Sequence, residues 1–213
     1  MLVIQREEPW RHWIMRGVMG DSMLARCLAA VPPATHPSWV RYDNDDERRK
    51  WACNDLDALG QMWRLLFARL HSPTFVADLE RVTGVEDLRP DPELWGAGLH
   101  VTFPGGHLSP HVDSAISPRT GLERRVNLVL YLNDHWLPAH GGGTTLSDWD
   151  GRGAVVYPEP DTALVWCCGD DTIHGADATH PTAPPRVTAA AYYWTVPRPG
   201  ATRRRALFLP RRS

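Results

Sequence analysis

The sequence has few features of a secreted or membrane protein. It has no apolar run near the ~20 residues that a membrane-spanning helix requires, so we expect no membrane segment. The first residues carry acidic and basic side chains in place of a long apolar core, so we expect no signal peptide. The four cysteines include no CxxC pair, and adjacent Cys167 and Cys168 cannot bridge without strain. Together these absences predict a cytoplasmic protein.

The chain also lacks a strong net charge and has almost no lysine. Its formal charge is −2, which gives no electrostatic reason to expect a nucleic acid or a membrane as partner. Lys50 is the only lysine of the chain. Arginines gather at the end of the sequence, where we interpret them as a solvated terminus; they are Arg198, Arg203, Arg204, Arg205, Arg211 and Arg212. The composition does not determine an oligomeric state.

The order of sequence patterns predicts an α+β chain. At 213 residues the chain is long enough for one well-filled core, so we expect a single domain over residues 1–213. Residues 1–93 are expected to be mainly helical, after a short strand at the start and with a short strand or arm over residues 38–43. Predicted helices begin at Asp21, at Asp45 or Asp46, and at Ser72.

From about residue 94, short runs rich in valine, leucine, tyrosine and tryptophan alternate with turn residues, which is typical of a sandwich or barrel. The expected strands are 94–103, 126–132, 144–146, 154–157, 163–168 and 187–196. We predict a β-domain over residues 94–197, braced by the N-terminal helices, and a basic tail over residues 198–213.

Three side chains form a candidate metal site. His111 and Asp113 lie two residues apart, so on an extended segment both point to the same side. His174 follows the buried-looking run 163–168 and completes a set of two histidines and one carboxylate. Such a set holds iron(II) on one face and leaves the opposite face open. Three further histidines are expected to be loop residues: His107, His140 and His180.

The wider pattern resembles the Fe(II)/2-oxoglutarate-dependent dioxygenases, in particular their prolyl-hydroxylase-like branch. The motifs that carry the resemblance are Pro104-Gly105-Gly106, His111-Val112-Asp113, Tyr131-Leu132-Asn133 with Trp136, Gly141-Gly142-Gly143, His174 and Arg186. The resemblance covers about residues 98–195. It implies a double-stranded β-helix (jelly-roll, cupin-like) core and an oxygenase that uses Fe(II), 2-oxoglutarate and O2.

The resemblance also implies individual roles. His111, Asp113 and His174 would be the catalytic iron ligands, and Arg186 would hold the distal carboxylate of 2-oxoglutarate with its planar fork. Tyr131 would bond the same carboxylate. Three more residues share strand faces with these two and are predicted to line the co-substrate pocket, namely Asn127, Val129 and Thr188. Because related halogenases lack the carboxylate ligand, Asp113 favours hydroxylation, ring closure or desaturation.

The substrate is the least determined part of the prediction. Candidate contacts are Arg41, Tyr42, Trp51, Ser114, Arg125 and Trp194, and a wider set comprises Trp39, Asp43, Asn54, Trp95, His100 and Arg119. The arginine-, alanine- and proline-rich composition is typical of GC-rich bacteria, in which small oxygenases often modify specialised metabolites. We therefore expect a small-molecule substrate and an antibiotic-biosynthesis type of role.

Three alternatives stay open from the sequence alone. One is a peptidyl or protein prolyl hydroxylase, which requires an open groove for an extended chain. The second is a cupin-like metal- or sugar-binding protein without redox chemistry, which has no need of Arg186. The third is a zinc hydrolase with the same three ligands, which would work without 2-oxoglutarate or O2.

Overall fold

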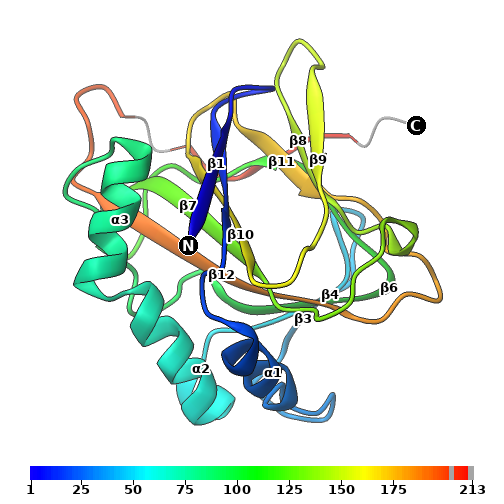
Figure 1. The fold of residues 1–213 in the computed structure, drawn as a ribbon. Coiled ribbons are helices and arrows are strands. Elements are labelled where there is room, and N and C mark those ends of the chain that lie inside the picture. Colours follow the sequence, from blue (N-terminus) through cyan, green and yellow to red (C-terminus); the bar gives the residue numbers. More distant parts are fainter. Residues whose placement is uncertain (202–203, 211–213) are drawn as a thin grey trace.

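The computed structural model describes residues 1–201 and 204–210 (Figure 1). Its main feature is one curled sheet of 13 strands, in which the strand pairs are antiparallel. Three α-helices lie together on the outside of this sheet (Figure 1). Among the described residues, none of the helices combines the length and apolar character needed to cross a membrane.

The elements have the following bounds. The helices are α1 (Asp21–Ala29), α2 (Leu56–Leu70), α3 (Pro73–Thr83) and the 3-10 turn η1 (Pro138–His140). The strands are β1 (Leu2–Arg6), β2 (His12–Arg16), β3 (Val40–Tyr42), β4 (Glu47–Cys53), β5 (Arg89–Pro90), β6 (Gly98–Val112), β7 (Glu123–Tyr131), β8 (Thr144–Ser147), β9 (Gly153–Val156), β10 (Thr162–Cys167), β11 (Ile173–Ala176), β12 (Arg186–Thr195) and β13 (Leu207–Phe208).

The long strand β6 connects the parts of the sheet that form the site. The main strand order is β1-β2-β10-β7-β12-β6-β11-β8-β9, and β4 and β13 also pair with β6. Strand β12 pairs with residues 98–102 of β6 and β4 pairs with residues 99–108, whereas the end of β6 pairs with β11 and β13. The end of β6 therefore lies beside a strand that comes some 60 residues later in the chain and beside the C-terminal segment.

Alternate side chains of the strands face either the apolar core under the helices or the concave inner side of the curled sheet. On β7, Val126, Leu128 and Leu130 are buried in the same apolar cluster as Trp63 and Phe67 of α2. The alternate side chains of β7 point to the opposite face. The helices thus cover one face of the sheet and leave the other face free to form a lined interior.

Two helices begin and end where local chemistry predicts. Ser72 caps α3 by accepting a hydrogen bond from the amide of Phe75, and Gly84 ends the helix with φ 72°. The predicted start of the first helix at Asp21 is likewise confirmed.

The prediction of a helix from Asp45 or Asp46 is wrong. Residues 47–53 form β4, and the helix begins only after Asp55, whose carboxylate accepts from the amides of Asp57 and Ala58. Pairing of β4 with β6 replaces the helical hydrogen bonds in this stretch. Beside the three helices, the region before residue 94 also contains the five strands β1 to β5.

Candidate active site

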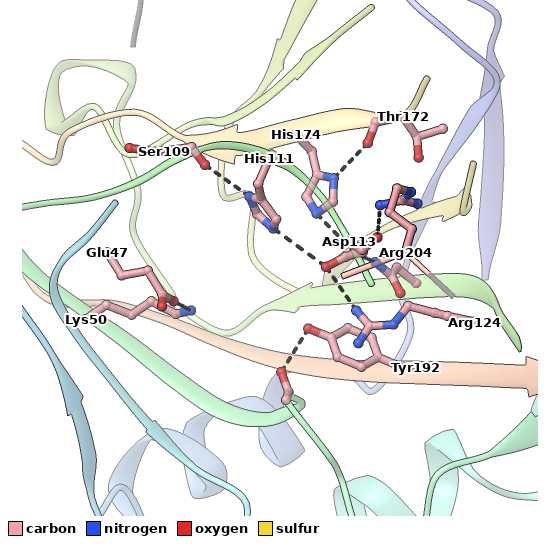
Figure 2. Close-up of polar contacts among 12 residues, drawn as sticks. Glu47, Lys50, Ser109, His111, Asp113, Arg124, Thr172, His174, Tyr192 and Arg204 are labelled. Atoms are coloured by element: carbon pink, nitrogen blue, oxygen red, sulfur yellow. Dashed lines mark hydrogen bonds and ion pairs between the residues drawn. The ribbon is translucent and has the colours of Figure 1, made fainter. Parts of the chain in front are cut away.

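The predicted metal-binding side chains come together inside the curled sheet. His111 lies directly opposite His174 in the pairing of β6 with β11, and Asp113 follows the last residue of β6. The Nε2 atom of His111 lies 3.7 Å from one Asp113 carboxylate oxygen, and that of His174 lies 3.4 Å from the other. One ligand atom from each side chain falls within 4.8 Å of the others, and Figure 2 shows the three converging.

Each histidine is held in the tautomer that a metal ligand needs. The Nδ1 atom of His111 lies 3.0 Å from the carbonyl oxygen of Ser109, and that of His174 lies 3.0 Å from the carbonyl oxygen of Thr172. Because a carbonyl only accepts, each Nδ1 carries the hydrogen and leaves the Nε2 lone pair free. Burial, reinforced by His111, lowers the pKa of His174 to about 4, so the ring is neutral at pH 7.

Asp113 is kept ionised by its neighbours. Burial by itself raises its pKa, but the nearby Arg124 guanidinium and the two histidines hold that pKa well below its usual range. Arg124 lies 3.0 Å from one carboxylate oxygen, and the amide of Asn127 donates to the other at 2.6 Å. The group therefore offers two imidazole nitrogens and a fixed carboxylate, a donor set that fits a divalent iron with open positions.

Arg124 is the main site residue that the sequence analysis missed. Its buried guanidinium lies within 4.0 Å of the ring centre of Tyr192, 5.1 Å of that of Trp194 and 5.9 Å of that of Trp95. These aromatic faces stabilise a cation that is otherwise removed from water.

A β-bulge places Arg124 at the site, and not the predicted Arg125. In the pairing of β7 with β12, Tyr193 lies opposite Val126 but Trp194 lies opposite Arg124, so Arg125 is the extra residue. A bulge reverses the alternation beyond it. Strict alternation from Asn127 assigns Arg125 to the inner face, whereas the bulge places Arg124 there. No sequence signal marks this bulge.

Two aromatic rings and the C-terminal segment close the metal site. Trp166 packs on His174 with ring centres 4.7 Å apart, and Phe208 of β13 stacks on His111 at 5.1 Å. Arg204 donates to the backbone carbonyl of Asp113 and to the Asp170 carboxylate.

The interpretation of the arginine-rich tail as solvated is therefore wrong for Arg204, which lies against the metal site. Arg198 is exposed, although it forms paired hydrogen bonds with the buried Glu123 carboxylate. Arg205 is exposed. Arg203, Arg211 and Arg212 lie outside the described residues.

A second polar group lies at the other end of the same interior. The Arg186 guanidinium donates to the Thr144 hydroxyl at 2.9 Å, and the Tyr131 hydroxyl lies 2.7 Å from the same oxygen. Arg186 is buried, its Nε has no hydrogen-bond partner, and no carboxylate among the described residues pairs with it. A buried arginine with free donors is a binding site for an anion such as a carboxylate.

The glycine turn before β8 makes room for this arginine. Gly142 has φ 64°, and a Cβ there would approach Thr179 Cγ2 to 2.8 Å and Arg186 Cδ to 3.3 Å. A larger residue would therefore combine an unfavourable backbone conformation with a clash.

One cavity of about 580 Å³ connects the three metal-binding side chains with Arg186. Its walls include three of the predicted co-substrate residues, Asn127, Val129 and Thr188. Asn127 differs from its expected role because its amide binds Asp113. Tyr131 is completely buried and reaches the site through Thr144, which does line the cavity.

The predicted substrate residues divide into two groups. Tyr42 and Ser114 line the cavity, as do Asn54, Trp95 and His100 from the wider set. Four other candidate contacts lie outside this lining: Arg41, Trp51, Arg125 and Trp194.

Each of these four has another environment. Arg41 donates to the carbonyl of Ala34 and lies over the ring of Trp51, which itself packs on Phe103. Trp194 is buried behind Arg124. Arg125 is the bulge residue described above, and the structure therefore gives no support for these four as cavity contacts.

Comparison with known proteins supports the same chemistry. Residues 97–194 match the 2OG-Fe(II) oxygenase superfamily. A comparison with curated proteins found no match.

Similar solved structures share the fold at low identity. A Trichoplax adhaerens prolyl hydroxylase, solved with a hypoxia-inducible factor peptide, is 15% identical with a TM-score of 0.64, covering 86% of this chain and 83% of that one. The epimerase SnoN from nogalamycin biosynthesis is 19% identical with a TM-score of 0.63, covering 85% and 76%. HygX from Streptomyces hygroscopicus, with nickel and 2-oxoglutarate bound, is 15% identical with a TM-score of 0.57, covering 86% and 82%.

The part that matches the 2OG-Fe(II) oxygenase superfamily, residues 97–194, contains His111, Asp113, His174 and Arg186, and the protein is an Fe(II)- and 2-oxoglutarate-dependent oxygenase. The predicted α+β class with a double-stranded β-helix core is confirmed, as is the prolyl-hydroxylase-like form of the fold. The family match and the donor set also favour the oxygenase over the sugar-binding and zinc-hydrolase alternatives.

Proposed function

We propose that this enzyme oxidises a C–H bond of a small molecule, by hydroxylation, ring closure or desaturation, at an iron held by His111, Asp113 and His174. Arg186 binds the distal carboxylate of 2-oxoglutarate. The observation that carries the proposal is the single cavity, which places a buried arginine without a carboxylate partner at one end and the three ligands at the other.

When bound, iron and 2-oxoglutarate supply the oxidation by O2, in which 2-oxoglutarate becomes succinate and CO2 while the substrate is oxidised. The chain's own residues prepare the site for it. Arg124 and Asn127 fix the Asp113 carboxylate, and the backbone carbonyls of Ser109 and Thr172 orient the two histidines. Thr144 and Tyr131 hold the Arg186 fork, so the co-substrate meets a donor group that is already positioned.

The size of the cavity favours a small substrate. Its volume of about 580 Å³ lies within the range of small-molecule sites, roughly 300–1,000 Å³. Two similar structures support this class, since HygX was also solved with hygromycin B bound and SnoN acts in nogalamycin biosynthesis. A role in bacterial specialised metabolism is consistent with both.

A protein or peptidyl prolyl hydroxylase is the second candidate function. The likeness to the Trichoplax adhaerens enzyme, which was solved with a peptide, supports it. The rate of succinate release distinguishes the two functions. Proline-containing peptides should raise this rate above the substrate-free value if the enzyme is a prolyl hydroxylase, and should leave it unchanged if the enzyme oxidises a small molecule.

The cofactor site is tested by anaerobic titration of the metal-free protein with Fe(II) and then 2-oxoglutarate. We expect the weak visible charge-transfer band of a chelated 2-oxo acid in the wild type. His174→Ala should lose iron binding, because even residues that only orient metal ligands typically contribute about 10- to 100-fold. Arg186→Ala should lose the band at moderate 2-oxoglutarate concentrations.

His140→Ala is the matched control, because His140 lies on η1 outside the cavity lining and should leave the band unchanged. Bound iron without a band in the wild type would contradict the proposed function.

A further inference from the structure

Lys50 and Glu47 of β4 form an ion pair on the cavity wall, away from the metal-binding side chains (Figure 2). The Lys50 ammonium lies 2.7 Å from the Glu47 carboxylate, and their side chains are only 13% and 18% exposed. The ammonium also lies 5.2 Å from the ring centre of Tyr42, which lines the same cavity.

An irregularity of the backbone brings the two side chains together. Residues three apart on a regular strand point to opposite faces. Between them Arg49 adopts φ 49°, a left-handed conformation, and the register with β6 shifts between Arg48 and Lys50. Unfavourable backbone geometry of this kind persists where the surroundings impose it, and it is common at functional sites. Here its result is a charged pair inside the cavity.

No step of the cofactor chemistry uses this pair. The other charged carboxylates and guanidinium groups of the cavity lining are Asp113, Arg124 and Arg186. The first two belong to the metal site, and the third is the proposed anchor of 2-oxoglutarate. Lys50 and Glu47 each retain free hydrogen-bonding positions, since an ammonium has three donors and a carboxylate several acceptor sites.

We propose that the Glu47–Lys50 pair recognises the substrate, and that the substrate carries an ammonium group next to an oxygen acceptor. This inference rests on the proposed function. The ammonium binds Glu47, and the neighbouring carboxylate or hydroxyl oxygen binds Lys50. A ligand with only the ammonium or only the oxygen acceptor would satisfy one partner of this poorly solvated pair and leave the other without compensation. Amino acids and amino sugars both have the required chemistry.

Lys50 has one competing assignment, as a second anchor for 2-oxoglutarate. Lys50 and Arg186 both lie opposite Thr102, on the two sides of β6. Both cations also lie near His100. Burial of this side chain, together with the charges of Lys50 and Arg186, holds the pKa of His100 well below its usual range. The test must therefore measure the co-substrate and the substrate separately.

The experiment uses calorimetry on the anaerobic protein with Fe(II) and 2-oxoglutarate, so that ligands bind without turnover. The probes are free amino acids and amino sugars, each beside an analogue with oxygen in place of nitrogen, such as lactate for alanine and glucose for glucosamine. The variants are Glu47→Gln and Lys50→Met. Arg48→Gln is the matched control, because Arg48 is exposed on the same strand and lies outside the cavity lining.

We expect at least one ammonium-bearing probe to bind the wild type and its oxygen analogue to bind at least about tenfold more weakly, since hydrogen bonds to charged groups have that magnitude. Glu47→Gln and Lys50→Met should each weaken the probe by a similar factor, while both keep the 2-oxoglutarate band. Arg48→Gln should bind like the wild type. The better-binding probe set identifies the source, amino acid or amino sugar.

Three results would overturn the inference: equal binding of a probe and its oxygen analogue, no binding by any ammonium-bearing probe, or a loss of 2-oxoglutarate affinity in Lys50→Met. Failure of the proposed function is a separate result, the absence of the band in the wild type. Probe binding is then measured on the metal-free protein, where the same comparison of variants applies.

Discussion

The cavity has two walls with different origins. The wall that carries His111, Asn127, His174 and Arg186 comes from β6, β7, β11 and β12, within the part that matches the superfamily. The wall that carries Tyr42, Glu47, Lys50 and Phe208 comes from β3, β4 and β13, outside that part. Both sets of strands join the same sheet, because β4 and β13 pair with β6.

The difference between the walls indicates a division of labour. In the core wall each charged group has a partner or a role in cofactor binding. The wall formed by β3, β4 and β13, here called the appended wall, carries the Glu47–Lys50 ion pair. This pair faces the same cavity but has no role in cofactor binding. We infer that the core wall carries the chemistry and the appended wall selects the substrate, which agrees with the general observation that function varies on a common scaffold.

The largest effect within the core wall is expected from Arg124→Met. The change leaves Asp113 partly buried without its cation, and breaking a buried ion pair costs about 3–5 kcal/mol of unfolding free energy. Urea unfolding of the metal-free variant measures this loss.

Arg125→Met is the matched control for Arg124, since the bulge turns Arg125 away from the site. Its free energy of unfolding should change by less than about 1 kcal/mol, the usual range for a residue outside such networks. Equal losses in the two variants would show that the bulge does not separate their roles.

A smaller effect tests whether the C-terminal strand supports the metal site. Phe208→Ala removes the ring stacked on His111, and an aromatic pair contributes about 0.5–1.5 kcal/mol. Iron affinity should therefore fall by about two- to tenfold, measured by anaerobic titration.

Leu207→Ala is the control on the same strand, because Leu207 is exposed and lies outside the cavity lining. Equal iron affinity of Phe208→Ala and Leu207→Ala would show that β13 does not support His111. The appended wall would then consist of β3 and β4 only.

The smallest effect is expected from the ion pair between Glu123 of β7 and Arg198 of the C-terminal segment. Burial raises the pKa of Glu123, but hydrogen bonds from Arg198 outweigh it and lower that pKa below 4.5. A lowered folded-state pKa contributes stability that is present above pH 4.5 and lost as the pH falls through the folded-state value.

Arg198→Gln should therefore reduce the free energy of unfolding by about 1 kcal/mol or less at pH 7, because the arginine is partly exposed. The difference from the wild type should shrink below pH 4. A difference that stays constant from pH 7 to pH 3 would mean that the pair does not stabilise the fold through charge.

The sequence predicted those parts of the site that follow regular alternation. His111 and Asp113 two residues apart, and Arg186 and Thr188 two residues apart, were placed on common faces, and the structure brings them to one cavity. Asn127 and Val129, predicted from the strand face that they share with Tyr131, also line this cavity, whereas Tyr131 itself is buried and reaches it through Thr144.

The parts that could not be predicted depend on irregular backbone or on contacts distant in sequence. Because of the bulge at Arg125, Arg124 occupies the position in the site that strict alternation assigns to Arg125. The left-handed conformation of Arg49 places Glu47 beside Lys50. Neither departure has a local sequence signal, because each depends on pairing with a distant strand. The helix predicted from Asp45 or Asp46 fails for a similar reason, since residues 47–53 pair with β6, which lies about 50 residues later in the chain.

The division between the two walls is tested most directly by the 2-oxoglutarate affinity of two variants that each remove one cation from the cavity. Arg186→Gln changes the core wall, and Lys50→Met changes the appended wall. With Fe(II) bound and O2 excluded, Arg186→Gln should weaken 2-oxoglutarate by at least about tenfold, the effect of losing hydrogen bonds to a charged group, while Lys50→Met stays within about twofold of the wild type. Equal weakening in both variants would contradict the division and make Lys50 part of the co-substrate site.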